Sequence, residues 1–254
     1  MKHLRQYIRE LILCEDRTPY DELIFRDIRN AKLFDEEMPD IDINFLADIV
    51  NLKNDYITSR DVFTPTEYNT FEDWFLRQLT PETYQQCIEN AKKSPICAPV
   101  QGEIRNYPFG GGRLKNSIIS APQLDDLLAN SRYKIQISLK KCDYHWVHAP
   151  CDGIITDIKT LEHGTLFPKS ESMTVFYIKS KYGDVALACI GEQTVQTFTK
   201  DAKVGDKISK MKPIGYFYFG SQILMGIQLP MSVFEGDFVF PGDPLCNQYP
   251  QRTT

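Results

Sequence analysis

Residues 216–224 constrain the fold of this chain more than any other stretch, and their sequence is YFYFGSQIL. Aromatic and β-branched residues favour a pleated, buried strand, while a glycine inside such a run is typical of a bulge or of a close approach by another backbone. The stretch therefore predicts a buried strand that is interrupted at Gly220 and Ser221. Either this is a bulged core strand, or Ser221 is a nucleophile aimed at the preceding carbonyl, which Gly220 leaves unshielded.

The composition indicates a globular protein and argues against several other classes. The net charge is −5 over 254 residues, which gives no broad electrostatic attraction to nucleic acid, so we expect no nucleic-acid partner. No segment approaches the roughly 20 apolar residues of a transmembrane helix, and the N-terminus lacks a signal-peptide pattern. We therefore expect a cytoplasmic protein whose seven cysteines are mostly reduced and structural. The oligomeric state stays open.

The first part of the chain, residues 1–65, is predicted to be an N-terminal helical extension. In its first helix, apolar residues recur at helical spacing and basic residues take other positions: Leu4, Ile8, Leu11 and Ile12 against Lys2, Arg5 and Arg9. This helix either packs on the core or lies in the membrane interface, where basic side chains meet anionic headgroups. In the second case residues 1–15 would make a peripheral contact on the inner face of the membrane.

The remainder, residues 66–254, is predicted to be a β-rich core, so the predicted fold class is α+β. One helix is expected over residues 70–79, where Thr70 is placed to cap it, and a helical insert over residues 123–130. From Ala98 onward, short apolar or alternating runs are separated by Gly, Asp and Pro, a pattern that predicts strands. Examples are residues 135–139, 175–178 and 185–190.

Three of the four histidines lie between residues 145 and 163. Zinc-ligand side chains occur at intervals of three in this part of the chain, at Cys142, His145, His148 and Cys151. The surrounding Tyr-x-Trp-Val sequence predicts a strand, however, and residues three apart on a strand face opposite ways, so we expect no metal site. The histidines are either ordinary core or surface residues, or one of them is a general base.

Five motifs stand together in the order found in a known family. They are residues 70–79 (TFEDWFLRQL) beside the family's TFNEFFTRKL, residues 98–102 (APVQG) beside SPADG, residues 114–128 beside KG…YSLEELL, residues 143–153 (DYHWVHAPCDG) beside DYHRFHSPVDG, and residues 215–221 (GYFYFGS) beside GYFKFGGST. Through these motifs the chain resembles the phosphatidylserine decarboxylases, enzymes that cleave themselves and make their own pyruvoyl cofactor.

The resemblance implies a zymogen that cleaves itself between Gly220 and Ser221. The Ser221 hydroxyl would attack the Gly220 carbonyl to form an ester, and a base would then remove the Ser221 α-proton. His148 matches the family's base, and His145 matches its second histidine. The pyruvoyl group at residue 221 would then convert phosphatidylserine to phosphatidylethanolamine and carbon dioxide, a step of phospholipid biosynthesis.

The chain departs from the family pattern at the residue that orients the base histidine. The family's SPADG aspartate, which orients the histidine, is replaced here by Gln101. If this segment is a strand, Glu103 lies on the same face as Gln101, and we identify it as the candidate stand-in acid, with Asp152 and Asp143 as weaker candidates. Two alternatives follow: a catalytically impaired relative that serves as a lipid-binding or interaction module, and a decarboxylase of a soluble amino acid.

Overall fold

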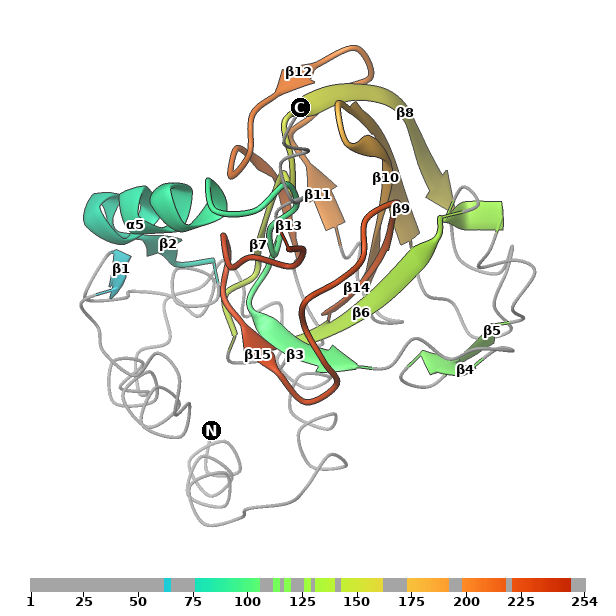
Figure 1. Cartoon of the computed structure of the whole chain (residues 1–254), viewed down its shortest axis with the longest axis horizontal. Helices are drawn as coiled ribbons and strands as arrows, with labels where there is room; N and C mark the ends of the chain where they lie inside the picture. Colours follow the sequence, from blue (N-terminus) through green and yellow to red (C-terminus); the bar gives the residue numbers. More distant parts are fainter. Residues whose placement is uncertain are drawn as a thin grey trace, which may run out of the picture. The chain divides into compact units, whose positions relative to one another are not determined.

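The structure is a computed structural model, and it describes residues 62–64, 76–105, 112–114, 117–119, 126–128, 131–139, 143–161, 173–191, 198–217 and 221–247. The chain divides into two compact units, residues 1–83 and 84–254. Its elements are β1 (Phe63–Thr64), β2 (Gln78–Leu79), α5 (Pro81–Ala91), β3 (Gly102–Arg105), β4 (Gly112–Leu114), β5 (Ser117–Ile119), β6 (Tyr133–Leu139), β7 (Trp146–His148), β8 (Gly153–Leu161), β9 (Met173–Ser180), β10 (Gly183–Gly191), β11 (Phe198–Lys200), β12 (Lys207–Ile208), β13 (Pro213–Phe217), β14 (Ser221–Ile227) and β15 (Phe238–Val239). Figure 1 labels them along the chain.

The α+β fold class is wrong, because the described part of the chain is mostly β, with 50% of it in strands and 11% helical. Among the elements that the structure describes, α5 is the one helix. The helices predicted within residues 1–65 fall outside the described residues except at 62–64, and there Phe63–Thr64 forms strand β1. The β-rich composition after Ala98 therefore dominates the fold.

The helix predicted over residues 70–79 is wrong at its C-terminal end, where Gln78–Leu79 forms β2 and pairs antiparallel with β1. The observed helix begins at Pro81 instead. Its start has a physical cause: the Thr80 hydroxyl oxygen accepts a hydrogen bond from the Thr83 N–H at 3.2 Å, and proline suits the first helical position. A residue that precedes proline is also disfavoured in the helical region, which keeps Thr80 outside the helix.

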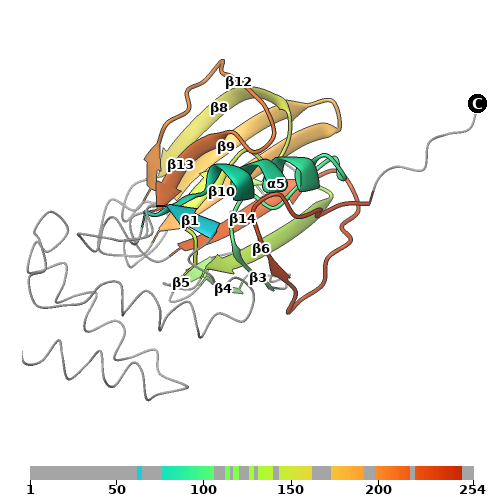
Figure 2. The ribbon, with the colours of Figure 1, turned by 90° about the vertical axis from the view of Figure 1, so that its left-hand side faces the viewer.

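The second unit is built on an eight-stranded antiparallel sheet with the order β12-β8-β9-β10-β14-β6-β3-β15. Figure 2 shows the long strands β8, β9, β10, β14 and β6 lying side by side. β14 lies between β10 and β6, so both of its edges are paired. A three-stranded antiparallel sheet, in the order β11-β13-β7, completes the framework of the candidate site.

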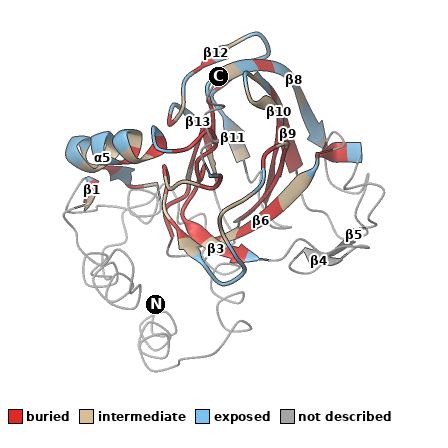
Figure 3. Cartoon of the chain, viewed as in Figure 1, coloured by how far each residue is buried: buried red, intermediate tan, exposed pale blue. Residues whose placement is uncertain are grey.

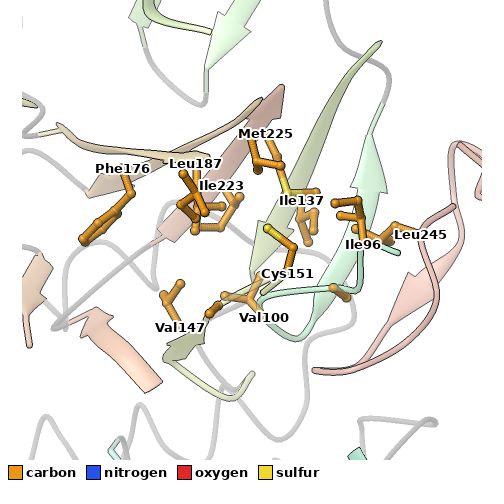
Figure 4. Close-up of a cluster of buried hydrophobic side chains, with 14 of the residues drawn as sticks. Ile96, Val100, Ile137, Val147, Cys151, Phe176, Leu187, Ile223, Met225 and Leu245 are labelled. Carbon is orange, nitrogen blue, oxygen red and sulfur yellow. The ribbon is translucent and has the colours of Figure 1, made fainter. Parts of the chain in front are cut away.

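The main hydrophobic core lies between the eight-stranded and three-stranded sheets. Three phenylalanines link the two sheets edge to face, because Phe198 of β11 lies 5.8 Å from Phe176 of β9 and 5.2 Å from Phe217 of β13, between ring centres. Figure 4 shows Val147 of β7 in the same cluster as Ile223 of β14. In Figure 3, β9 and β10 are coloured mostly as buried, whereas α5 carries exposed residues along one side.

The opposite face of the eight-stranded sheet is also covered, at β9, β10 and β14. Leu127 and Leu128 pack there against residues of β9, β10 and β14, and Asp126 and Leu127 are helical, within the insert predicted over residues 123–130. Close packing explains Gly226 in β14, since any side chain at this position would overlap Ser131. β14 is therefore buried on both faces, as its near-continuous apolar sequence indicates.

The strand predicted over residues 216–224 is in fact two strands in different sheets. β13 ends at Phe217 in the three-stranded sheet, and β14 begins at Ser221 in the eight-stranded sheet. Residues 218–220 between them, which include Gly220, lie outside the described residues. In the part of the chain that the structure describes, no helix is both long and apolar enough to cross a membrane.

Candidate active site

Strand β7 places the histidine pair. It pairs antiparallel with β13, with Trp146 opposite Tyr216 and His148 opposite Pro213. The Trp146 and Tyr216 rings lie 4.9 Å apart between centres, which strengthens the pairing at its more exposed end. The strand predicted around the histidines is thus confirmed. Among the described residues, no group of three or more His, Cys, Asp or Glu is arranged to hold a metal ion.

The His148 imidazole is buried, with 1% of the residue exposed, and both of its nitrogens have defined contacts. Nδ1 lies 2.8 Å from the Met211 carbonyl oxygen, and Nε2 lies 3.1 Å from the Tyr144 hydroxyl. A carbonyl oxygen only accepts, so Nδ1 carries the hydrogen. In the neutral ring Nε2 is then unprotonated and accepts from the Tyr144 O–H. Nε2 is therefore the basic atom of this histidine.

The ring is neutral at physiological pH. Burial lowers the pKa of His148 from 6.5 to about 4, and the hydrogen bond to the Met211 carbonyl opposes that shift only in part. Aromatic rings enclose it: Tyr144 stacks at 5.7 Å and Tyr84 of α5 lies at 5.9 Å, between ring centres. A buried neutral imidazole with one unprotonated nitrogen is able to accept a proton, and its lowered pKa makes it a weaker base than an exposed histidine.

The Met211 carbonyl is shared between two donors. The Tyr84 hydroxyl donates to it at 2.8 Å, in addition to the His148 Nδ1–H at the same distance. Met211 has φ 69°, the left-handed conformation that non-glycine residues rarely adopt, and its own N–H donates to the Ala149 carbonyl at 2.9 Å. The surrounding contacts thus maintain an uncommon backbone conformation that directs this carbonyl at the imidazole.

Gln101 belongs to the same network through Tyr144. Its side chain is buried, and its Oε1 accepts a hydrogen bond from the Tyr144 main-chain N–H at 2.9 Å. Glu103, the candidate stand-in acid, lies in β3 and forms an ion pair with Arg105 at 2.9 Å, with 25% of its side chain exposed. Tyr144 thus connects Gln101 to His148, since it binds the first through its backbone and the second through its hydroxyl.

His145 directly precedes β7, and Ser221 is the first residue of β14. His145 is fully buried, and its carbonyl accepts a hydrogen bond from the Phe217 N–H at 3.0 Å. Ser221 pairs with Leu139 of β6 and Gly191 of β10. Along the chain, His145 therefore lies opposite a residue four positions before Ser221, whereas His148 lies opposite Pro213, eight positions before it.

Sequence reasoning missed three members of this network. Tyr144 stands inside the histidine motif, so its position next to His145 was a signal that could have been used. Tyr84 contributes from α5, a helix that was not predicted, and nothing in the local sequence marks it. Met211 acts through its backbone carbonyl, and a main-chain group has no sequence signature.

A family model described as phosphatidylserine decarboxylase matches residues 71–246, a segment that contains every residue of this network. The chain belongs to the phosphatidylserine decarboxylase family. This is a family of decarboxylases. The resemblance to the family that the five sequence motifs indicated is thereby confirmed.

Two curated relatives show how divergent this member is. A phosphatidylserine decarboxylase proenzyme from Francisella tularensis subsp. novicida is 26% identical over 202 residues, which span 63% of this chain and 69% of the relative. Phosphatidylserine decarboxylase proenzyme 2 from Oryza sativa subsp. japonica is 24% identical over 224 residues, which span 78% of this chain and 35% of the relative. Both are named as proenzymes.

Proposed function

We propose that this chain is a self-cleaving phosphatidylserine decarboxylase whose pyruvoyl group is made from Ser221. The observation that carries the proposal is His148, a buried neutral imidazole with Nε2 as its basic atom, inside the segment that the family model matches. Proton removal by a positioned imidazole is the step that self-cleavage requires. Ser221 lies in the same matched segment, at the beginning of β14.

Self-cleavage involves two proton removals. First, the Ser221 hydroxyl loses its proton as the oxygen attacks the Gly220 carbonyl carbon, and an ester replaces the peptide bond. Second, a base takes the Ser221 α-proton and the Gly220 carboxylate leaves, which ends the first chain at residue 220. Hydrolysis of the remaining dehydroalanine releases ammonia and leaves the pyruvoyl group on residues 221–254, a chain of 34 residues. We assign these proton removals to Nε2 of His148, whose lone pair is released for each step when the Tyr144 O–H turns away from it, with His145 as the second candidate.

The position of residue 221 fits such a group. Ser221 pairs with Leu139 on one side and with Gly191 on the other, so a chain end created there stays anchored in the sheet. A pyruvoyl group supplies a ketone that bonds to a substrate amine and an electron sink for the loss of carbon dioxide. The role of this chain's residues is then to bind the substrate, exclude water and move protons.

Phosphatidylserine is the proposed substrate because of the family. Trp146 occupies a position where the family resemblance gives arginine, and its ring packs on Tyr216, so the surroundings of the site differ from the family pattern. Two substrates are therefore compared in separate assays: free serine in solution, and vesicles that contain phosphatidylserine. Release of carbon dioxide from the vesicles supports a phospholipid substrate, and release from free serine alone would point to a soluble amino acid.

Intact-mass analysis of the purified full chain tests self-cleavage directly. We expect two species, residues 1–220 and a fragment of residues 221–254 with a pyruvoyl end. Ser221→Ala should remain a single full-length chain. A parent protein that stays full length with an intact Ser221 contradicts the proposal and favours the alternative of an impaired relative that serves as a binding module.

His148→Asn supplies the matched variant for the base. Asparagine keeps an N–H near the position of Nδ1 but has no counterpart of Nε2, so the contact to the Met211 carbonyl is retained while the basic atom is lost. We expect cleavage to slow by about 10²–10⁴-fold, the usual contribution of general base catalysis. Cleavage at the parent rate would assign the base role to another residue, with His145→Asn as the next variant.

Membrane contact through residues 1–15 is a prediction on a segment that lies outside the described residues. The division of the chain at residue 65 into an extension and a core is likewise still a prediction. We propose a peripheral location on the inner face of the membrane, because the proposed substrate is a phospholipid and the first segment is basic and amphipathic. Flotation with anionic liposomes, with and without residues 1–15, tests it: unchanged binding after the deletion would remove the membrane role from this segment.

A further inference from the structure

The contacts that orient His148 come from groups other than the side chain at position 101. Gln101 binds the main chain of Tyr144, whereas the two ring nitrogens of His148 contact the Met211 carbonyl and the Tyr144 hydroxyl. A base histidine needs a partner that fixes its tautomer, because the wrong tautomer presents a hydrogen where the lone pair should be. The structure supplies that partner from the turn before β13.

The turn that carries Met211 is fixed by several contacts. The Lys212 N–H donates to the Ser209 carbonyl at 3.0 Å, and the Lys210 N–H donates to Asp152 Oδ1 at 2.8 Å. The Lys210 ammonium donates to the Ala91 carbonyl at the end of α5, at 2.9 Å. These contacts tie the turn to α5 and to the residues before β8. The Met211 carbonyl is therefore a rigid acceptor rather than one that reorients easily.

Tyr84 completes the environment of this carbonyl. Its hydroxyl and the His148 Nδ1–H both donate to the Met211 oxygen, at 2.8 Å each, so both lone pairs of the carbonyl are used. Tyr144 occupies the other ring nitrogen of His148 with a donor. A flip of the imidazole would leave a buried N–H and a buried carbonyl without their partners, which costs about 1–3 kcal/mol for each unsatisfied group.

We propose that the Met211 carbonyl and the hydroxyls of Tyr84 and Tyr144 position His148 as the neutral Nδ1–H tautomer, and that this arrangement replaces the carboxylate that Gln101 lacks. The inference rests on the proposed function in assigning His148 as the base. All three are positioning residues, because they act through His148. A carbonyl differs from a carboxylate in having no net charge, so it fixes the tautomer without stabilising the imidazolium.

No charged side chain of the described residues contacts the His148 imidazole, as expected if an uncharged carbonyl orients it. Two titratable side chains contact the imidazole among the described residues, Tyr84 from α5 and Tyr144 from the segment before β7. The influences on its pKa are burial and the Met211 carbonyl, with no contribution from a charged side chain of the described residues. His148 therefore stays a neutral base at mildly acidic pH, where a histidine beside a carboxylate would already be protonated.

Nitrogen-15 NMR of the uncleaved full-length Ser221→Ala protein tests the tautomer without any need for cleavage. The two ring signals of His148 are identified by their absence in Ser221→Ala/His148→Asn. We expect a protonated Nδ1 and an unprotonated Nε2 at about pH 7, unchanged at about pH 5.5. Tyr144→Phe keeps the ring and removes the hydroxyl, and it should shift the signals towards the other tautomer. A protonated Nε2 in the Ser221→Ala protein would overturn the proposal.

The rate of self-cleavage provides the second readout, in protein that retains Ser221. Tyr84→Phe and Tyr144→Phe should each slow cleavage roughly tenfold, because each removes one hydrogen bond that holds the base network. Tyr133→Phe is the matched control, since Tyr133 lies opposite Ile227, at the other end of β14 from Ser221. Parent-like cleavage in both variants would contradict the positioning role. A parent protein that never cleaves while NMR shows the Nδ1–H tautomer would refute the proposed function alone.

Discussion

The main-chain N–H of Phe217 donates a hydrogen bond of 3.0 Å to the carbonyl of His145. It extends the β7–β13 pairing to the last residue of β13, and the next described residue, Ser221, belongs to the other sheet. The proposed cut therefore falls between the end of β13 and the first residue of β14. Ser221 itself pairs with Leu139 and Gly191, so the pairing of β14 holds the new chain end after cleavage.

The first prediction concerns the two chains after cleavage. β14 pairs with β6 from Ser221 to Ile227 and with β10 from Ser221 to Gly226, and Ile223 and Met225 are fully buried. The fragment of residues 221–254 thus supplies a central strand, and we expect it to co-elute with residues 1–220 in native size-exclusion chromatography and to separate in denaturant. Loss of the fragment under native conditions would contradict this pairing.

The second prediction concerns Glu103. Either its carboxylate or the Met211 carbonyl orients His148, and the two possibilities predict different effects of a substitution at Glu103. If Glu103 stands in for the missing aspartate, Glu103→Gln should slow self-cleavage. If the Met211 carbonyl orients the imidazole, the rate should equal that of the parent, since the described partner of Glu103 is Arg105. We expect the parent rate. Intact-mass time courses on freshly refolded protein measure it, and a tenfold slower Glu103→Gln would return the orienting role to the carboxylate.

Stability should depend on pH through His148. Its pKa is about 4 in the folded chain against 6.5 for an exposed imidazole, so between these values the unfolded chain binds more protons. This contribution to stability is fully present above about pH 6.5 and is lost as the pH falls toward 4. Between about pH 7.5 and pH 5 we expect a loss of about 2 kcal/mol in the free energy of unfolding.

Urea unfolding of the uncleaved Ser221→Ala chain, with and without His148→Asn, isolates this effect. Asparagine does not titrate, so the variant should lose about 2 kcal/mol less than its parent over the same pH interval. Every other titrating group is common to the two proteins and cancels in the difference. Parallel pH profiles would show that His148 is not a buried neutral imidazole.

Much of the β core could be predicted from the sequence, since strand patterns there reflect burial directly. The runs at residues 135–139, 175–178 and 185–190 lie within β6, β9 and β10, all buried central strands. The prediction of a helix over residues 70–79 was wrong at its C-terminal end, although the apolar spacing there suits a helix. The pairing of β2 with β1 and the proline at position 81 decide the local structure instead. Tertiary pairing overrides local periodicity in such short segments.

The candidate site was predictable only in part, and for a different reason. His148 and Ser221 stand in recognisable motifs, but what a histidine does depends on its neighbours in space. The Met211 carbonyl lies 63 residues from His148 in the sequence, and its direction follows from a backbone conformation that no residue type signals. The replacement of the family's aspartate by Gln101 was visible in the sequence. The Met211 carbonyl that contacts His148 instead was not.

The last prediction concerns the cysteines, which were expected to be mostly reduced and structural. Cys87, Cys97, Cys151, Cys189 and Cys246 are free and buried. Burial raises the pKa of the Cys97 and Cys189 thiols and raises that of Cys151 to about 12, so very little reactive thiolate forms near neutral pH. We expect iodoacetamide to label these five positions slowly in native protein and rapidly in guanidinium, as read by peptide mass spectrometry. Rapid native labelling of Cys97 or Cys151 would be incompatible with the packed structure, because both residues are fully buried, Cys151 lies in the main hydrophobic core, and the Cys97 N–H donates to the Pro150 carbonyl at 2.9 Å.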